Sequence, residues 1–278
     1  MVRICDQFLS IQGEGKRTGI PSLFIRSFGC NLCCKGFGQK DPADKSTWIE
    51  PEYSLTKSPE YGCDSPNSWH KMFEHLFPDY ATGKDFLDAL LQKYKKEDFS
   101  EIVITGGEPL LHQEFWIEFF RALQFEGIHP NNVTFETNGI IKPTIEMVCF
   151  IDTASQHGAW NFLFSVSPKL NCVAGVNENI SINLETLRYY IYLKEDGTAD
   201  FQFKFVYNGD ERAHTRLVEI YESLKEFGLE KQDIMLMPVG GAKVEQEIKI
   251  KTAETCMKEG WRYCERVHVD IWGSKMGV

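Results

Sequence analysis

Helical and strand-like patterns alternate along the chain after residue 80. Thr82 and Asp85 stand in the order of a capping box just before one helical stretch. Gly127 follows a second helical stretch at a position where helices commonly end. The apolar residues recur with the spacing of an amphipathic helix in three stretches, which are 86–94, 115–123 and 217–224.

Short runs of β-branched and aromatic residues lie between these helical stretches and are typical of buried strands. Strands that alternate with helices predict an α/β fold, with a mostly parallel sheet and right-handed crossovers. The chemistry of such folds lies at the carboxyl ends of strands, where Thr105-Gly-Gly-Glu108 and Glu136-Thr-Asn-Gly139 occur. The predicted strands are 22–28, 101–105, 133–136, 162–166, 201–206, 234–237 and 267–271.

Residues 35–80 interrupt this pattern. They are rich in Pro, Ser, Asp, Lys and aromatic residues and have no regular period. The length of 278 residues allows one large domain or two small ones, and the chain contains no internal repeat. We therefore expect a single domain over residues 1–278, with an insertion at about 35–80.

The composition excludes several classes of protein. Apolar residues make up 42% and charged residues 25%, as in soluble globular proteins. No apolar stretch approaches the ~20 residues that a membrane-spanning helix needs. The formal net charge of −10 disfavours a nucleic-acid binder, which needs a basic surface. The first residues lack the apolar core of a signal peptide, so we expect a cytoplasmic protein.

The cysteines are the main candidates for chemistry. Cys30, Cys33 and Cys34 follow the predicted strand 22–28. Nine cysteines are an odd number, and they are too sparse in a chain of this length for a disulfide framework. A Cys-x3-Cys pair at a strand end suits an iron–sulfur cluster, and three thiolates on a four-iron cluster leave one iron open. Structural zinc, which usually has four protein ligands, and plain thiols remain alternatives on spacing alone.

The sequence resembles the 7-carboxy-7-deazaguanine synthase family of radical S-adenosylmethionine (SAM) enzymes. The most specific motif is Ser10-Ile-Gln-Gly-Glu-Gly15, whereas Thr105-Gly-Gly-Glu-Pro109 is shared by the wider superfamily. The resemblance implies a full or partial parallel (β/α) barrel of the radical SAM type. The other matching blocks are Gly19-Ile-Pro-Ser-Leu-Phe-Ile-Arg26, Gly29-Cys-Asn-Leu32, Glu136-Thr-Asn-Gly139, Ser167-Pro-Lys169 and His268-Val-Asp-Ile-Trp-Gly273.

The chain departs from the family pattern at the third cluster cysteine. The pattern Cys-x3-Cys-x2-Cys-Asp-Thr would place that cysteine where this chain has Phe37. Cys63 follows the insertion in the sequence Cys-Asp-Ser and is the implied displaced ligand, with Cys33 as the alternative. A long excursion between ligands is tolerable, because doubling a loop costs only ~0.6 kcal/mol. The implied ligands of the 4Fe-4S cluster are Cys30, Cys34 and Cys63.

The resemblance also implies which residues bind SAM. In the family, the segment at Gly106 and Gly107 meets the methionine part of SAM, and glycine lets the backbone approach closely. Without the cysteines, these glycines would indicate only a tight turn, and Lys169 would be interpreted as a surface residue. The implied SAM-binding residues are Thr105, Gly106, Gly107, Glu108, Asn138, Ser167 and Lys169.

Residues near both ends of the chain are implied to bind a carboxylated pterin. Gln12 and Glu14 suit the donor–acceptor edge of the pterin, and Arg26 suits its carboxylate. Spacing alone would indicate only a polar turn and a salt-bridging arginine. His268 lies in the predicted strand 267–271, and the resemblance implies that it contacts the substrate. The terminal carboxylate, here that of Val278, contacts substrate in some family members.

The resemblance adds a magnesium ion and a reaction. Ser65 matches the threonine that holds Mg²⁺ in the family, and this cation prefers oxygen ligands. The implied reaction converts 6-carboxy-5,6,7,8-tetrahydropterin to 7-carboxy-7-deazaguanine with loss of ammonia, in queuosine-type 7-deazapurine biosynthesis. We expect a homodimer and an electron donor such as flavodoxin or ferredoxin, with no nucleic acid or membrane partner. The alternatives are an activase of a glycyl-radical enzyme and a zinc-stabilised binding module.

Overall fold

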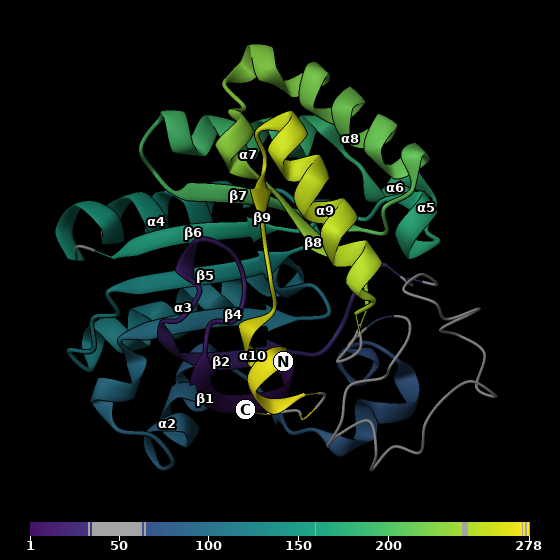
Figure 1. Ribbon diagram of the computed structural model, residues 1–278. Helices are drawn as coiled ribbons and strands as arrows, with labels where there is room; N and C mark the ends of the chain where they lie inside the picture. The colour runs from purple at the N-terminus through teal and green to yellow at the C-terminus, as the bar shows by residue number, and fades with distance from the viewer. Residues whose placement is uncertain are drawn as a thin grey trace.

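A nine-stranded sheet forms the frame of the protein (Figure 1). The computed structural model describes residues 1–32, 34, 63, 65–158, 160–240, 244–273, 275 and 277. The predictions made for Cys33, Val278 and residues 35–62 of the insertion therefore lie outside the described residues. The strand order is β3-β1-β2-β4-β5-β6-β7-β8-β9.

The sheet is mostly parallel, as the sequence predicts. β1 pairs antiparallel with β2 and β3, and every pair from β2 to β9 is parallel. Within the described residues β3 and β9 do not pair with each other, so the sheet is the partial rather than the full barrel. The strands are β1 (Val2–Ile11), β2 (Pro21–Ser27), β3 (Asp79–Tyr80), β4 (Glu101–Gly106), β5 (Asn132–Thr137), β6 (Asn161–Val166), β7 (Asp200–Tyr207), β8 (Ile234–Pro238) and β9 (Arg262–Tyr263).

Helices connect the parallel strands and pack against the sheet and against each other. α2 packs on α3, α3 on α4, and α7 on both β7 and α8. Figure 1 shows the short α10, in yellow, in front of the strands that begin the chain. The helices are α2 (Gly83–Leu91), α3 (Gln113–Phe125), α4 (Ile145–Gly158), α5 (Asn171–Ala174), α6 (Glu178–Ser181), α7 (Leu184–Glu195), α8 (Glu211–Leu224), α9 (Gln246–Glu259) and α10 (Val267–Trp272).

The predicted helix ends are confirmed for α2 and α3. The Thr82 hydroxyl accepts a hydrogen bond from Asp85 N, and the Asp85 carboxylate accepts one from Thr82 N, both at 3.1 Å. This reciprocal capping box satisfies backbone groups that the first turn leaves unpaired. Gly127, with φ +68°, follows α3 in the left-handed conformation that glycine adopts easily.

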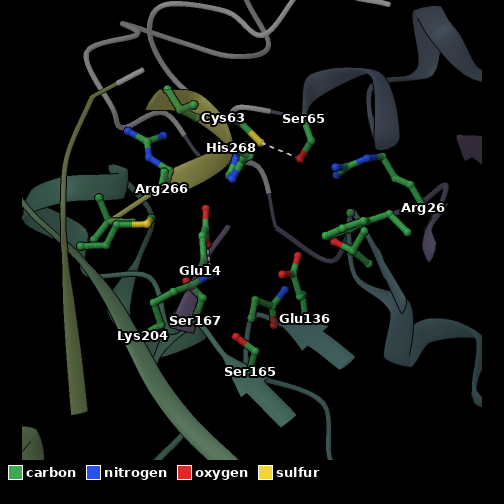
Figure 2. Close-up of a pocket in the computed structure, with 18 of the residues that line it drawn as sticks. Glu14, Arg26, Cys63, Ser65, Glu136, Ser165, Ser167, Lys204, Arg266 and His268 are labelled. Atoms are coloured by element: carbon green, nitrogen blue, oxygen red, sulfur yellow. Dashed lines mark hydrogen bonds and ion pairs between the residues drawn. The ribbon is translucent and has the colours of Figure 1, made fainter. Parts of the chain in front are cut away.

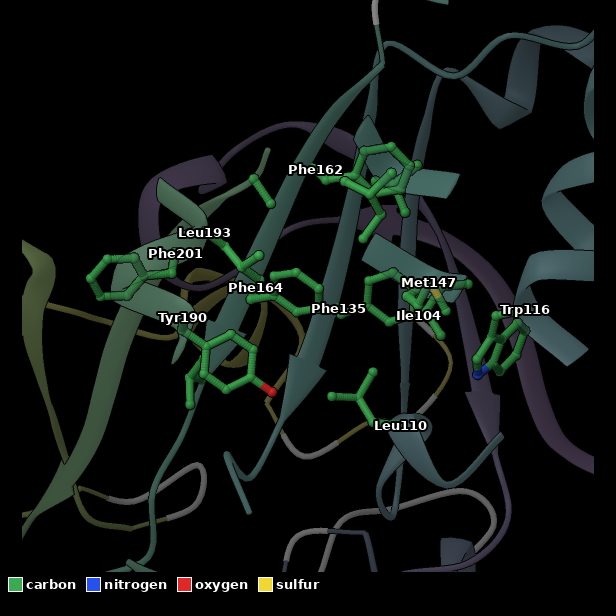
Figure 3. Packing of buried hydrophobic residues seen from close by; sticks show 14 of the residues in the cluster. Ile104, Leu110, Trp116, Phe135, Met147, Phe162, Phe164, Tyr190, Leu193 and Phe201 are labelled. Carbon is green, nitrogen blue, oxygen red and sulfur yellow. The ribbon is translucent and has the colours of Figure 1, made fainter. Parts of the chain in front are cut away.

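Aromatic side chains fill the space between the sheet and the helices (Figure 3). Phe135 of β5 stacks on Phe164 of β6 with ring centroids 5.5 Å apart, and Phe164 meets Tyr190 of α7 at 5.1 Å. All three side chains are fully buried. Each buried phenylalanine contributes about 2–3 kcal/mol of hydrophobic stabilisation. This core fixes the strands whose carboxyl ends carry the predicted motifs.

Hydrogen bonds and an ion pair hold the turn after β1 against the amino-terminal ends of the parallel strands. The 3₁₀ turn η1 (Gly15–Arg17) carries Lys16, whose Nζ donates to both carboxylate oxygens of Asp200 at 2.8 and 2.9 Å. Arg17 donates to Thr134 Oγ1 and to the Asn161 carbonyl oxygen, both at 2.8 Å. These bonds reach the first residues of β5, β6 and β7. The segment just before η1, which contains two predicted substrate residues, is therefore held in place.

The prediction of a strand at 267–271 is wrong, because these residues form the helix α10. Val, His, Val, Asp and Ile alternate like a strand, but the chain leaves β9 there and crosses toward the turn after β1. Val267 N donates to the Gly13 carbonyl oxygen at 3.0 Å. No neighbouring strand is available to the described backbone at this point. A helical turn satisfies its own backbone groups, as the 2.7 Å bond from Gly273 N to Val269 O illustrates.

The last part of the predicted insertion belongs to the frame of the domain. It forms the 3₁₀ segments η3 (Pro66–Ser68) and η4 (Lys71–Leu76), followed by β3 on the edge of β1. Phe73 is fully buried. Gly29 N donates to the Ser68 carbonyl oxygen at 2.7 Å, which ties this part to the cysteine loop after β2.

Candidate active site

A cavity of about 280 Å³ opens at the carboxyl ends of the parallel strands. Arg26 of β2, Thr105 of β4, Glu136 of β5 and Lys204 of β7 all line it. Figure 2 shows side chains from these strands and from α10 around one shared space. The sequence-based expectation that the polar motifs gather at this end of the sheet is confirmed.

Three cysteines that are distant in the sequence meet at the wall of the cavity. Cys30, Cys34 and Cys63 all line it. Trp69 Nε1 donates a hydrogen bond to Cys63 Sγ at 3.3 Å. The three cysteines share an apolar cluster with Leu32, Ile140, Ala174 and Val176.

The chemistry of this donor set fits a cluster rather than a single ion. In the described part of the chain, no three His, Cys, Asp or Glu side chains lie close enough to hold one metal ion. A four-iron cluster binds each cysteine to a different iron, so its thiolates stand further apart. Burial raises the pKa of the Cys30 thiol to about 12, and only a bound metal would stabilise its thiolate at neutral pH.

The two glycines after β4 fit closely against the cysteine loop. A Cβ atom on Gly107 would lie 2.2 Å from the Gly29 carbonyl oxygen and 2.8 Å from Cys30 Cβ. A Cβ on Gly106, whose φ is +149°, would lie 2.2 Å from the Ser27 carbonyl oxygen. No other residue type fits these positions, so bare backbone faces the cavity beside Cys30.

Unlike the other predicted SAM residues, Glu108 does not line the cavity. Its side chain is fully buried, and its carboxylate accepts hydrogen bonds from Leu110 N at 3.0 Å, Asn138 N at 2.8 Å and Thr137 Oγ1 at 2.8 Å. Burial raises the pKa of this carboxyl, while the hydrogen bonds act in the opposite direction. Glu108 therefore connects the glycine turn to the end of β5.

The remaining predicted SAM residues form a polar wall of the cavity. Asn138 Nδ2 donates to Asn31 Oδ1 at 2.7 Å and lies 4.0 Å from Cys30 Sγ. Lys169 Nζ donates to Ser167 Oγ at 3.0 Å. With Thr105, these side chains surround the space next to the cysteines.

The predicted substrate residues Gln12 and Glu14 are joined by hydrogen bonds. Gln12 is buried, and its Oε1 accepts a bond from Glu14 N at 3.1 Å. Its Nε2 donates to Glu136 Oε1 at 3.2 Å. One amide side chain thus fixes two carboxylate-bearing residues on the same side of the cavity.

Glu14 forms an ion pair with Lys204, whose Nζ donates to Glu14 Oε2. Burial is the largest single effect and favours the neutral carboxyl, but the charge and hydrogen bond of Lys204 and the positive charges of His268 and Arg266 together outweigh it. The pKa of Glu14 consequently falls to about 2. Glu14 is a carboxylate at any pH near neutrality.

His268 and Arg26 approach the same space from opposite sides (Figure 2). A Cβ on Gly13 would lie only 1.8 Å from His268 Nδ1, so the imidazole of α10 rests on the backbone beside Gln12. The Arg26 guanidinium makes no hydrogen bond or close ion pair to the other described residues, although its charge acts against the burial that raises the pKa of the nearby Asp6 carboxyl. Both Arg26 and His268 line the cavity.

Ser65 also lines the cavity, with its Oγ 3.9 Å from Cys63 Sγ. Its carbonyl oxygen accepts bonds from Ser68 N at 3.0 Å and from Ser68 Oγ at 2.7 Å. These bonds fix the backbone that carries the hydroxyl beside the third cysteine.

Comparisons with known proteins identify the family. The profile of the 4Fe-4S single cluster domain matches residues 11–149, a range that includes the three cysteines. The 7-carboxy-7-deazaguanine synthase of Halobacterium salinarum is 31% identical over 97% of this chain and 90% of its own. This chain belongs to the 7-carboxy-7-deazaguanine synthase family of radical SAM proteins.

Other members of the 7-carboxy-7-deazaguanine synthase family match at similar length. The proteins of that name from Leptospira interrogans and Rhodopirellula baltica are 29% and 26% identical, covering 98% and 99% of this chain and 95% and 88% of theirs. The crystal structure of QueE from Escherichia coli has a TM-score of 0.54 at 21% identity, covering 96% of this chain and 94% of that one. That structure shares the fold.

Sequence reasoning gave no role to several residues that line the cavity of this family member, and three of them carry polar groups near the proposed site. Glu136 lies in a quoted motif but received no role, and Trp69 lies at the end of the aperiodic stretch. Lys204 alternates with apolar residues along β7, since Phe203 and Phe205 flank it and are buried. The polar residues Asp200, Gln202 and Lys204 at every second position of this strand are the signal that could have revealed it. In the described part of the chain, no helix is long and apolar enough to cross a membrane.

Proposed function

We propose that this protein is a carbon–nitrogen lyase that converts 6-carboxy-5,6,7,8-tetrahydropterin into 7-carboxy-7-deazaguanine with loss of ammonia. One observation carries the proposal: the same cavity is lined by the gathered cysteines and by polar residues suited to a pterin. The relative from Halobacterium salinarum, which matches nearly the whole chain, supports the same reaction. The product belongs to 7-deazapurine biosynthesis of the queuosine type.

Cys30, Cys34 and Cys63 would hold the 4Fe-4S cluster in this proposal. Their shared apolar surroundings and the match to a 4Fe-4S domain support the assignment. When bound, the cluster and SAM supply the radical chemistry, which belongs to the cofactors. The apolar cluster around the cysteines keeps water away from that chemistry.

The SAM molecule would lie between the cysteines and the polar wall of the cavity. The bare backbone at Gly106 and Gly107 allows a ligand to approach closely. The ammonium group of Lys169 suits a carboxylate, and Asn138 and Ser167 offer hydrogen bonds next to it. Thr105 completes this set, whereas Glu108 contributes by holding the turn.

The pterin would lie between the acidic side of the cavity and Arg26. The carboxylates of Glu14 and Glu136 accept hydrogen bonds, and the N–H groups of a pterin edge are donors. The Arg26 guanidinium donates no hydrogen bond to the described residues, so it suits the substrate carboxylate as a bidentate donor. His268 closes the cavity over the same space. Such fixed contacts orient the substrate before reaction.

Further elements complete the proposal. Ser65 offers a hydroxyl oxygen for Mg²⁺ beside the third cysteine, and oxygen ligands suit this ion. The terminal carboxylate of Val278 is proposed to contact the substrate. We also propose a cytoplasmic homodimer, built from a single domain per chain, that receives electrons from a flavodoxin or ferredoxin.

Anaerobic turnover tests the proposed function. The cluster-loaded protein is incubated with SAM, Mg²⁺, a low-potential reductant and 6-carboxytetrahydropterin, and products are identified by mass. We expect 7-carboxy-7-deazaguanine from the wild type and from Cys33→Ser, and none from Cys63→Ser. Cleavage of SAM without this product would leave the superfamily chemistry intact and contradict the assigned substrate.

A further inference from the structure

Lys204 is a buried cation whose role the motifs do not explain. It projects from β7, is only 6% exposed and lines the cavity. Its Nζ donates to Glu14 Oε2, a residue 190 positions away in the sequence (Figure 2). Lysine is almost never fully buried unless it is paired. The buried Glu14–Lys204 pair therefore either has a role in the cavity or carries a large desolvation cost without one.

Lys204 belongs to a set of linked polar side chains that line the substrate space. Gln12 joins Glu14 to Glu136 through bonds of 3.1 and 3.2 Å, and the charge of Lys204 interacts with both carboxylates. The charge of one lysine thus acts on two acceptors. Its bond holds Oε2 of Glu14, while the described residues donate no hydrogen bond to Oε1.

Other charged or titratable groups also face Glu14. From α10 and its first turn, His268 and Arg266 add positive potential, and Cys264 after β9 lies close by. Glu136 of β5 adds a like charge through its link to Gln12. Among the described side chains, only Lys204 bonds the carboxylate, and it contributes the largest attraction. Without it, burial would favour the neutral acid.

We propose that Lys204 is the positioning residue that keeps Glu14 ionised and aims its second oxygen at the N–H donors of the bound pterin. The inference rests on the proposed function, because it concerns how that substrate is recognised. A neutral Glu14 would direct the O–H donor of its carboxyl group at the N–H donors of the pterin. The hydrogen bonds would then be mismatched, and affinity would fall.

Equilibrium binding tests this role. The cluster-loaded protein with SAM, but without reductant, is titrated anaerobically with 6-carboxytetrahydropterin from about pH 6 to about pH 9. In Lys204→Met, affinity should fall about tenfold for each unit by which the Glu14 pKa exceeds the pH. Binding should therefore recover as the pH rises. Lys251→Met is the matched control, since Lys251 is half exposed and pairs only on the surface of α9.

A double-variant cycle separates positioning from direct contact. In the Glu14→Gln background, Lys204→Met should change the dissociation constant by less than about twofold and add no pH dependence. This double variant removes both charges of the Glu14–Lys204 pair, so it keeps the test available if Lys204→Met alone does not fold.

Three results would overturn the inference. If Lys204→Met lowered the affinity for the pterin equally in the wild type and in Glu14→Gln, Lys204 would contact the ligand itself. Unchanged binding in Lys204→Met, with a pH profile like that of the wild type, would mean that the pair has no part in recognition. Absence of pterin binding by the wild type would overturn the proposed function and this inference together. The two failures are distinguishable, because in the first two results the wild type still binds the pterin.

Discussion

Replacing Glu108 with glutamine distinguishes a residue that holds the site together from one that binds SAM. Glu108 Oε1 accepts bonds from Leu110 N and Thr137 Oγ1, and Oε2 accepts one from Asn138 N. Glutamine keeps the shape of the side chain but has a single acceptor oxygen. Its amide nitrogen would face the Asn138 N–H, so that buried donor would lose its partner.

The magnitude follows from the bonds that are lost. A hydrogen bond to a charged group contributes about 1.5–3 kcal/mol, and an unsatisfied buried N–H costs a similar amount. We expect Glu108→Gln to lower the free energy of unfolding by about 2–3 kcal/mol. For a chain of this size that corresponds to a melting temperature lower by about 3–5 °C. Because the carboxylate does not line the cavity, the affinity for SAM should change by less than about threefold.

The assay compares thermal unfolding by circular dichroism with SAM binding by equilibrium dialysis, at equal cluster loading. Glu114→Gln is the control, since Glu114 is exposed on α3 and its replacement should be nearly neutral. Unchanged stability together with a SAM affinity reduced more than about tenfold would refute the reasoning and restore Glu108 as a direct ligand.

Other predictions address the cluster, the charge in the cavity and its shape. Cys63→Ser should lose most of its iron and sulfide after reconstitution while Cys33→Ser keeps them; the reverse pattern would exchange the two assignments. Since the Glu14 pKa is lowered to about 2 from 4.5, its contribution to stability, about 3 kcal/mol, is present above pH 4.5 and is lost as the pH falls toward 2. The stability gap between the wild type and Glu14→Gln, measured by urea unfolding, should therefore shrink over that range, and a constant gap would contradict the pairing. Gly13→Ala should displace His268 and weaken pterin binding without loss of iron, and unchanged affinity would show that the imidazole is not fixed there.

The regular elements were predictable wherever one face of the element is buried. The stripe over 115–123 identifies α3, and its Phe119 and Phe120 side chains are fully buried. The alternation in Val267–Ile271 misled the prediction, because strand formation depends on a partner that local sequence cannot supply. α10 instead rests on the Gly13 carbonyl oxygen, a contact between the two ends of the chain.

The candidate site could be predicted where a motif follows a strand. Thr105, Asn138 and Ser167 lie at the cavity because parallel strands bring their carboxyl ends together. The pairing of Glu14 with Lys204 could not be predicted in this way. It depends on the register of β7 and on the anchored turn after β1, which only the folded chain specifies.

The ratio of product formed to SAM consumed by the wild type, under anaerobic turnover, tests the central claim most directly. The proposed function places the cluster, SAM and the pterin in one cavity and includes the regeneration of SAM, as the family resemblance implies. It therefore predicts many molecules of 7-carboxy-7-deazaguanine for each SAM lost. Consumption of SAM with no 7-carboxy-7-deazaguanine, by protein with a full complement of iron, would contradict it.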